Sequence, residues 1–130
     1  MINMIEVAAA IIEETDGRML IARRREGKSQ AGLWEFPGGK IEVGESPELC
    51  LIRELQEEMN IKIEPYAFFA VNEHTYDTVT IRLIAYKARI LGGTIQLSDH
   101  EEYKWVQAAE LTQYQFAPAD IPFVEQLSAH

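Results

Sequence analysis

The stretch from Trp34 to Ile61 constrains the fold most, because it encodes a strand end, a glycine loop and a capped helix in succession. Pro37 must end the short strand, since proline lacks the amide that a sheet needs and has a fixed φ. The two glycines after it allow positive φ and let another group approach the backbone closely. Ser46 is a favoured N-cap, and the proline that follows is tolerated in a first turn. The helix is therefore predicted to run to about Met59, with Asn60 in left-handed geometry.

The predicted helix has an apolar face and an acidic face. The apolar arc recurs at the helical period and must pack on a core; it contains Leu49, Leu51, Ile52, Leu55 and Met59. Glu54, Glu57 and Glu58 form a separate arc, where like charges repel and the helix dipole disfavours anions. This arc is either a solvated surface or a set of metal ligands, because several carboxylate oxygens suit Mg²⁺ or Mn²⁺. The nearby Gly-Gly loop, Arg53 and Glu45 favour the metal site.

The spacing of these residues resembles the signature box of the Nudix hydrolases. From Gly39 the chain reads G-x5-E-x7-R-E-L-x-E-E-x-N-I, which keeps every charged position of that box. Only Asn60 departs from it, where the family has glycine, and asparagine is the best non-glycine occupant of left-handed geometry. The resemblance implies a hydrolase with the α/β Nudix fold, in which a mixed central β-sheet is sandwiched between α-helices.

The composition limits the partners of the chain. A net charge of −9 over 130 residues provides no basic footprint for a nucleic-acid polymer or an anionic membrane. We expect a single domain over residues 1–130, no signal peptide, no membrane span and a cytoplasmic location. The single cysteine, Cys50, cannot form an internal disulfide and is predicted to be a packed residue rather than a nucleophile. A small nucleotide is the expected partner, and the choice between monomer and homodimer stays open.

The rest of the chain is predicted to be mainly strands. Residues 3–13 form a continuous apolar run typical of a central strand, and Asp16-Gly17 is a hairpin signal that leads to a strand at 18–24. Further strands are predicted at 62–64, 67–73, 78–90, 94–97 and 101–106, with a break at Pro65 and a turn at Gly92-Gly93. A helical turn at 108–111 and a helix at 120–127 complete an α/β domain.

Beyond the box, the chain resembles the MutT-like branch of the family, especially the bacterial CTP pyrophosphohydrolases. The segments that carry this resemblance are residues 30–36 (QAGLWEF), 37–40 (PGGK) and 116–122 (FAPADIP). The branch cleaves nucleoside triphosphates to the monophosphate and pyrophosphate with Mg²⁺, for which Mn²⁺ is a possible substitute. Its substrates include CTP, dCTP, methylated dCTP and oxidised purine nucleotides such as 8-oxo-dGTP. The sequence leaves open the base, the sugar, and a role in DNA repair through pool sanitation as opposed to pyrimidine turnover.

The same resemblance implies roles for individual residues. The expected metal ligands are the backbone carbonyl of Gly38 and the carboxylates of Glu54, Glu57, Glu58 and Glu102, with Glu101 as the alternative to Glu102. Catalysis is assigned to Glu54, which would activate or orient the water, together with Glu57 and Arg53. Arg53 is expected to hold the carboxylates by charge-assisted hydrogen bonds. Arg24 is expected to reach the substrate phosphates, although the basic residues 23–25 are equally compatible with a solvated strand end.

The base is expected to bind near Asp120. Pro118 and Pro122 restrict the backbone on either side of this residue. Asp120 is either the N-cap of the last helix or, as the resemblance implies, the residue that hydrogen-bonds the edge of the base. Phe36 and Tyr76 are expected to flank the base as apolar or stacking surface.

Other functions remain open. Family members that hydrolyse dinucleoside polyphosphates carry a tyrosine beyond the box, and Tyr76 lies close to the corresponding position. Members that hydrolyse ADP-sugars have a proline at a similar distance, where this chain has none. A non-catalytic nucleotide-binding module is a third reading, but such relatives usually lose box carboxylates that are all present here.

Overall fold

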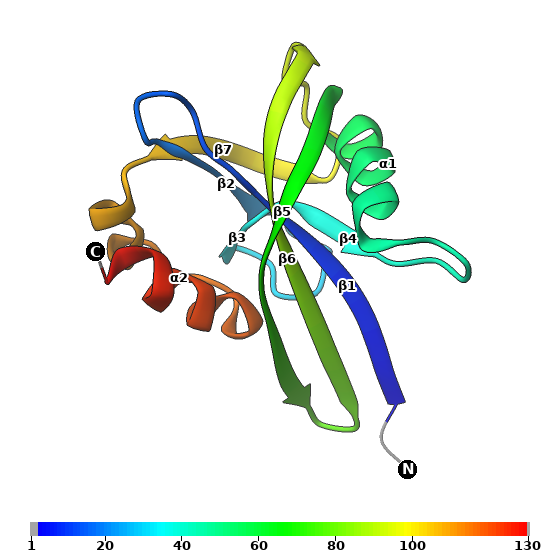
Figure 1. The fold of residues 1–130 in the computed structure, drawn as a ribbon. Helices are drawn as coiled ribbons and strands as arrows, with labels where there is room; N and C mark the ends of the chain where they lie inside the picture. Colours follow the sequence, from blue (N-terminus) through cyan, green and yellow to red (C-terminus); the bar gives the residue numbers. More distant parts are fainter. Residues whose placement is uncertain (1–2, 130) are drawn as a thin grey trace.

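The computed structural model describes residues 3–129 (Figure 1). Its strands are β1 (Asn3–Ile12), β2 (Met19–Arg24), β3 (Trp34–Glu35), β4 (Gly38–Lys40), β5 (Ile61–Tyr76), β6 (Val79–Gly93) and β7 (His100–Val106). Its helices are α1 (Pro47–Met59) and α2 (Ile121–Ser128), with 3-10 helices at Ala108–Gln113 and Pro118–Asp120. No helix in this part of the chain is long and apolar enough to cross a membrane.

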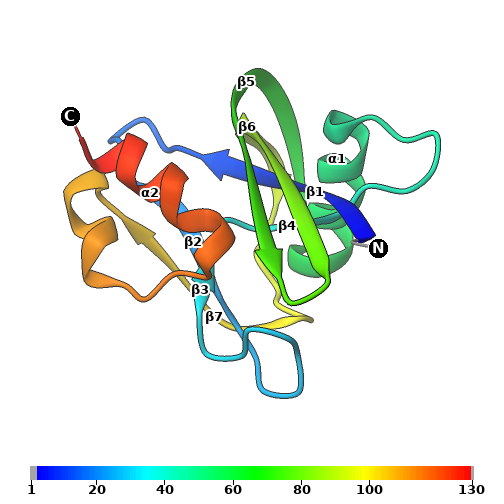
Figure 2. The same cartoon turned by 90° about the horizontal axis from the view of Figure 1, so that it is seen from below.

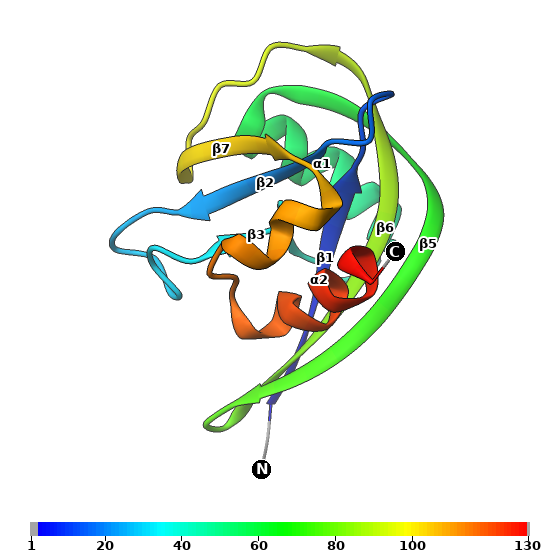
Figure 3. The ribbon, with the colours of Figure 1, turned by 90° about the vertical axis from the view of Figure 1, so that its left-hand side faces the viewer.

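The strands form two sheets. The larger sheet is mixed and has the order β4-β1-β6-β5, with β1 and β6 parallel and the other neighbours antiparallel. The smaller sheet is antiparallel and has the order β3-β2-β7. Figure 2 shows α1 and α2 on opposite sides of β5 and β6, and Figure 3 shows α2 in front of the mixed sheet with α1 behind it. The predicted α/β class, with a mixed sheet between helices, is confirmed.

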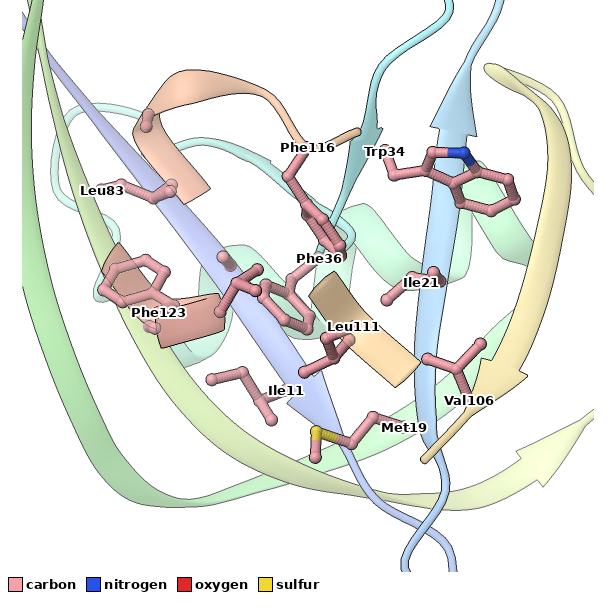
Figure 4. Close-up of a cluster of buried hydrophobic side chains, with 14 residues drawn as sticks. Ile11, Met19, Ile21, Trp34, Phe36, Leu83, Val106, Leu111, Phe116 and Phe123 are labelled. Carbon is pink, nitrogen blue, oxygen red and sulfur yellow. The ribbon is translucent and has the colours of Figure 1, made fainter. Parts of the chain in front are cut away.

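Strand β1 contributes to two cores at once, because successive side chains of a strand point to opposite faces. Ala8 and Ala10 pack with the buried residues of α1, whereas Ala9 and Ile11 pack with α2 and the aromatic cluster drawn in Figure 4. The prediction of a central strand is therefore correct. Cys50 lies fully buried in the α1 core, where burial raises the pKa of its thiol to about 12, so it is a packed residue as expected.

The turn at Asp16-Gly17 is present, but the antiparallel pairing on either side of it is short. The Gly17 amide donates to the Glu14 carbonyl at 2.9 Å and Gly17 has a φ of +87°, as a tight reversal requires. The Glu14 amide donates to the Arg18 carbonyl at 2.8 Å and Glu13 forms an antiparallel bridge with Met19, after which β1 and β2 diverge into different sheets. The buried part of each strand, Ala8–Ile12 in β1 and Met19–Ala22 in β2, has apolar side chains on both faces. Each strand therefore needs a covering layer on both of its faces.

The predicted break at Pro65 is absent. β5 runs without interruption from Ile61 to Tyr76 and absorbs the proline in register shifts between Lys62 and Ile63 and between Pro65 and Ala67. β5 is an edge strand that pairs only with β6, so a residue without an amide can be accommodated there at a bulge.

The segment at 94–97, predicted as a strand, instead caps the end of α1. The Gln96 amide donates to the Met59 carbonyl at 3.0 Å, and the Ser98 amide donates to the Glu58 carbonyl at 3.1 Å. Gly93, at the end of β6, has a φ of +98°, and a Cβ there would lie 2.5 Å from the Asn60 carbonyl oxygen. The last carbonyls of a helix need partners, and this segment supplies them.

Candidate active site

A pocket of about 580 Å³ opens between α1, the mixed sheet and the segment that precedes α2. Its lining includes Glu54 and Glu58 of α1 together with Asp99. It also includes an apolar group formed by Ile5, Val7, Val79, Ile81 and Leu83, with Asp120 beside it. Arg24, Glu35 and His100 are part of the same wall. The pocket therefore has chemistry for both a charged and an apolar part of a ligand.

Helix α1 positions the acidic residues, and its predicted ends are confirmed. The Ser46 hydroxyl accepts from the Leu49 amide at 3.1 Å, and Pro47 occupies the first turn. Asn60 closes the helix with a φ of +59°, the left-handed geometry expected for this position. This cap lets the glutamates of the last two turns stay on one regular helix despite their mutual repulsion.

Arg53 ties the helix to the loop before it. Its guanidinium donates to both Glu45 oxygens, at 2.8 and 2.9 Å, and to Glu54 Oε1 at 2.6 Å. It also donates to the Lys40 carbonyl at 3.2 Å. These bonds hold the pKa of Glu45 at about 2. Charge-assisted, bidentate bonds of this kind fix direction as well as distance, so Arg53 orients the Glu54 carboxylate.

The two glycines before the helix are required by close approach. A Cβ on Gly39 would lie 2.3 Å from the Glu54 carboxyl carbon, and a Cβ on Gly38 would lie 1.8 Å from the Ala8 carbonyl oxygen. The absence of side chains therefore lets β4 lie against β1 and lets the Glu54 carboxylate rest on β4. The side chain of Glu54 is only 14% exposed as a result.

Glu58 is the most perturbed carboxyl of the acidic group. Its Oε2 is buried without a hydrogen-bond partner. Burial first, and then the neighbouring Glu54, Asp99 and Glu35, raise the pKa of Glu58 to about 9. A buried carboxyl that faces other carboxyls is stabilised when a cation enters their midst. The donor set therefore fits a divalent metal ion.

Asp99 was not singled out from the sequence, and neither were Glu35 and His100. Asp99 lines the pocket with Glu58 and raises the pKa of that carboxyl. Its position depends on the 94–99 segment that binds the end of α1, which was predicted as a strand. No local signal identifies it, because the contacts that place it are long-range.

The structure does not bring Glu57 and Glu102 to the pocket wall. Glu57 is 61% exposed and lies 3.5 Å from Arg53. Glu102 pairs with Arg23 at 3.0 Å and with Lys104 at 3.9 Å, and Glu101 also pairs with Arg23, at 3.5 Å. Within residues 3–129, no three acidic, histidine or cysteine side chains already surround one point as metal ligands. The ligand roles of Glu54 and Glu58 therefore stay predictions, and those of Glu57 and Glu102 require in addition that these side chains move to the pocket.

Arg24 lines the pocket but its guanidinium is engaged by the protein. Nη1 donates to Glu35 Oε1 at 3.0 Å, and Nε donates to the Ser29 carbonyl at 2.6 Å. Glu35 Oε2 lies 2.8 Å from His100 Nε2. The contact of Arg24 with the substrate phosphates stays a prediction.

Asp120 occupies the N-cap position of α2, but its side chain does not cap the helix. Oδ2 accepts instead from the Phe36 amide at 3.0 Å, in a buried position. Burial and the nearby Glu35 raise the pKa of Asp120 well above its usual value, against the opposing effects of the Phe36 amide and Arg24. The reading as a simple helix cap is therefore wrong, because the carboxyl turns inward to the pocket wall.

Of the two predicted aromatic residues, only Tyr76 lines the pocket. Its hydroxyl accepts from the Ala119 amide at 3.3 Å, next to Asp120. Phe36 is 2% exposed and packs on Phe116 in the core, with ring centroids 5.4 Å apart (Figure 4). Its expected stacking role is not supported, because the side chain packs in the core. Phe36 contacts the pocket wall through its backbone amide, which donates to Asp120.

The comparisons with known proteins agree with this geometry. A model of the NUDIX domain matches residues 4–127. The CTP pyrophosphohydrolase of Escherichia coli K12 is 42% identical over 127 residues, which cover 98% of this chain and 93% of the relative. The putative 8-oxo-dGTP diphosphatase 2 of Mycobacterium tuberculosis is 37% identical, with 98% and 90% covered. The solution structure of the E. coli ORF135 protein is similar, with a TM-score of 0.84 and 42% identity over 98% of this chain and 91% of that one. The chain therefore belongs to the Nudix family and is a hydrolase of its MutT-like branch.

Proposed function

We propose that this chain hydrolyses nucleoside or deoxynucleoside triphosphates to the monophosphate and pyrophosphate, with Mg²⁺ as cofactor and Mn²⁺ as a substitute. The observation that carries the proposal is one pocket whose lining includes both the acidic residues of α1 and an apolar group with a buried carboxyl. A nucleotide has a matching division between its phosphates and its base. The carboxylates alone would repel the phosphates, so the acidic part serves this purpose only with a cation.

The metal would be held by Glu54, Glu58 and Asp99, with the Gly38 carbonyl as a further ligand. The unpartnered Glu58 oxygen, and the position of Asp99 beside Glu54 and Glu58 in the lining of one pocket, support this set. When bound, a divalent cation neutralises phosphate charge and lowers the pKa of a coordinated water. Glu54, held in direction by Arg53, is the residue that would orient the attacking water.

The base would lie between the apolar residues and Asp120. Because the pKa of Asp120 is raised, its carboxyl is protonated over a wider pH range and is able to donate as well as accept. As an acceptor, such a carboxyl suits the amino group of cytosine. As a donor, it suits an oxidised purine. The names of the relatives include both classes, CTP and 8-oxo-dGTP, so the proposed substrates are nucleotides of these two kinds.

A panel of substrates with product analysis tests the proposal. CTP, dCTP, 8-oxo-dGTP, a dinucleoside tetraphosphate and ADP-ribose should be compared with Mg²⁺ and with EDTA, and the phosphate products separated. We expect pyrophosphate and a monophosphate from a triphosphate, faster at alkaline pH, and no turnover with EDTA. Orthophosphate release, or activity undiminished by EDTA, would contradict the proposal. Preference for the dinucleotide or ADP-ribose would favour the alternative hydrolases, and binding without turnover would favour a non-catalytic module.

A further inference from the structure

Glu35 lines the same pocket as Asp120 and Glu58. Its chain neighbour Phe36 donates an amide hydrogen bond to Asp120 at 3.0 Å. Its hydrogen-bond partner His100 directly follows Asp99, and both residues line the pocket as well. Negative charge on Glu35 also raises the pKa of both Asp120 and Glu58. A ligand that fills this pocket from Asp120 to Glu58 is therefore within reach of Glu35.

The carboxylate of Glu35 is held rigidly. Arg24 Nη1 donates to Oε1 at 3.0 Å, and His100 Nε2 lies 2.8 Å from Oε2. The side chain of Glu35 is 14% exposed, that of His100 is 2% exposed, and His100 Nδ1 is buried without a partner. Each carboxylate oxygen has two lone-pair directions, so one direction on each oxygen is not used by these bonds. Glu35 is thus an oriented acceptor in the pocket wall.

The part of a nucleotide between base and phosphate that can donate a hydrogen bond is the sugar, through its hydroxyl groups. A phosphate oxygen would be repelled by this carboxylate, and an apolar group would leave the second lone-pair direction of each oxygen without a donor. Resting on the proposed function, we propose that Glu35 accepts a hydrogen bond from a sugar hydroxyl of the bound nucleotide. Arg24 and His100 are the positioning residues that hold Glu35 for this contact. Hydrolysis then depends on the presence of that hydroxyl.

The wild-type protein provides the first test. The kcat/KM should be measured for CTP, 2′-deoxy-CTP, 3′-deoxy-CTP and 2′,3′-dideoxy-CTP, or for the same series on the preferred base. A hydrogen bond to a charged group predicts about a 10- to 100-fold loss for the dideoxy nucleotide. The two singly deoxygenated nucleotides identify which hydroxyl is bound. Equal kcat/KM for all four nucleotides, within about twofold, would overturn the proposal without any variant.

Glu35→Gln provides the second test. The glutamine amide can keep both neighbours of Glu35. Its oxygen can accept from Arg24, and its nitrogen can donate to His100 Nε2 if the imidazole proton moves to Nδ1. His100 Nδ1 has no hydrogen-bond partner, so this change of tautomer breaks no other bond. The variant should lose kcat/KM for the hydroxyl-bearing nucleotide and change little for the dideoxy nucleotide, so that the two become similar. Glu64→Gln is the matched control, since Glu64 is exposed on β5 and pairs only with Arg89 among the described ion pairs.

Other outcomes would overturn the inference. An equal loss for all four sugars would make Glu35 a structural residue, and an altered ranking of bases with an unchanged ranking of sugars would make it a base contact. If the wild type hydrolyses no triphosphate, the proposed function fails instead. Calorimetric binding of the corresponding cytidine monophosphates to both proteins then gives the same sugar comparison without turnover. Equal affinities of the wild type for all four monophosphates would reject the sugar contact there too.

Discussion

Glu58, whose Oε2 is buried, and the buried Asp120 both line one pocket, and burial raises the pKa of both. Their surroundings differ. Glu58 faces Glu54 and Asp99 and has an oxygen without a partner, whereas Asp120 accepts from the Phe36 amide beside apolar residues. Burial is the first cause of the raised pKa of both carboxyls, and neighbouring carboxyls add to it. A cation bound by Glu58 and Glu54 would offset these causes at Glu58, because it would contact that carboxylate directly. Asp120 lies beside apolar residues and accepts from the Phe36 amide, so we expect its raised pKa to persist when the metal binds. Burial therefore prepares one carboxyl to lose its proton to a metal and the other to keep it.

The largest expected effect comes from a substitution among the acidic residues of the pocket. Glu54→Gln keeps the shape of the side chain but removes the charge that is held by Arg53. We expect kcat to fall on the order of 10²- to 10³-fold, with a much smaller change in KM and an intact fold. Steady-state kinetics at saturating Mg²⁺ measure kcat and KM, and a thermal melt shows whether the fold is intact. Kinetics like those of the wild type would place the catalytic carboxylate elsewhere, with Glu102 as the next residue to test.

The response of stability to Mg²⁺ sharpens the contrast. Without metal, the folded protein keeps a proton on Glu58 up to about pH 9 that the unfolded chain releases near its ordinary pKa of 4.5, so stability falls as pH rises across this window. Mg²⁺ at one hundred times its Kd should add about 2.7 kcal/mol. Glu58→Gln should raise the metal-free Tm at pH 8 and lose most of the gain with Mg²⁺. Thermal unfolding in EDTA and in Mg²⁺ at pH 6 and pH 8, with Glu64→Gln as the control, measures this. An unchanged Mg²⁺ shift would exclude Glu58 as a ligand.

Asp120→Asn tests the second carboxyl of the comparison and its role in selecting the base. The amide can still accept from the Phe36 amide, but its donor and acceptor ends are fixed, so the ranking of bases should change by about tenfold. Because the raised pKa makes the wild type less stable as pH rises above the ordinary value of 3.8, the variant should lose part of that slope. The nucleotide panel and urea unfolding at several pH values measure these effects. A uniform loss or retention for every base would mean that the base is recognised elsewhere.

Tyr76→Phe should have the smallest effect. It removes the hydroxyl that accepts from the Ala119 amide, and leaving that amide without a partner costs about 1 kcal/mol. Urea unfolding should detect this loss, while the KM for the preferred triphosphate changes less than about threefold, on the order of half a kcal/mol. A selective loss with a dinucleoside polyphosphate would instead support the alternative substrate class for which Tyr76 was considered.

Local signals predicted the parts of the site that depend on neighbouring residues. Ser46 and Asn60 mark the ends of α1, and the spacing of the box places Glu54 and Glu58 on one face. Contacts between distant segments were beyond such signals. Asp99 lines the pocket beside Glu58 in a chain segment whose residues Gln96 and Ser98 bind the end of α1, and Glu102 pairs with Arg23 on β2. The break predicted at Pro65 was wrong because the position of β5 at the edge of the sheet also depends on long-range contacts. An edge strand accommodates a proline that a central strand does not.

The three alanines of β1 limit how homologous chains of this kind can change in length. Inserting or deleting one residue within the strand would exchange the side chains that face α1 with those that face α2. It would also shift β4, whose Gly38 is paired with Ala9 and lies where the Ala8 carbonyl leaves no room for a side chain. The acidic residues of α1 and the apolar residues of the pocket would then move relative to one another. Insertions should therefore accumulate in the loops on either side of β1, while the strand itself keeps one length.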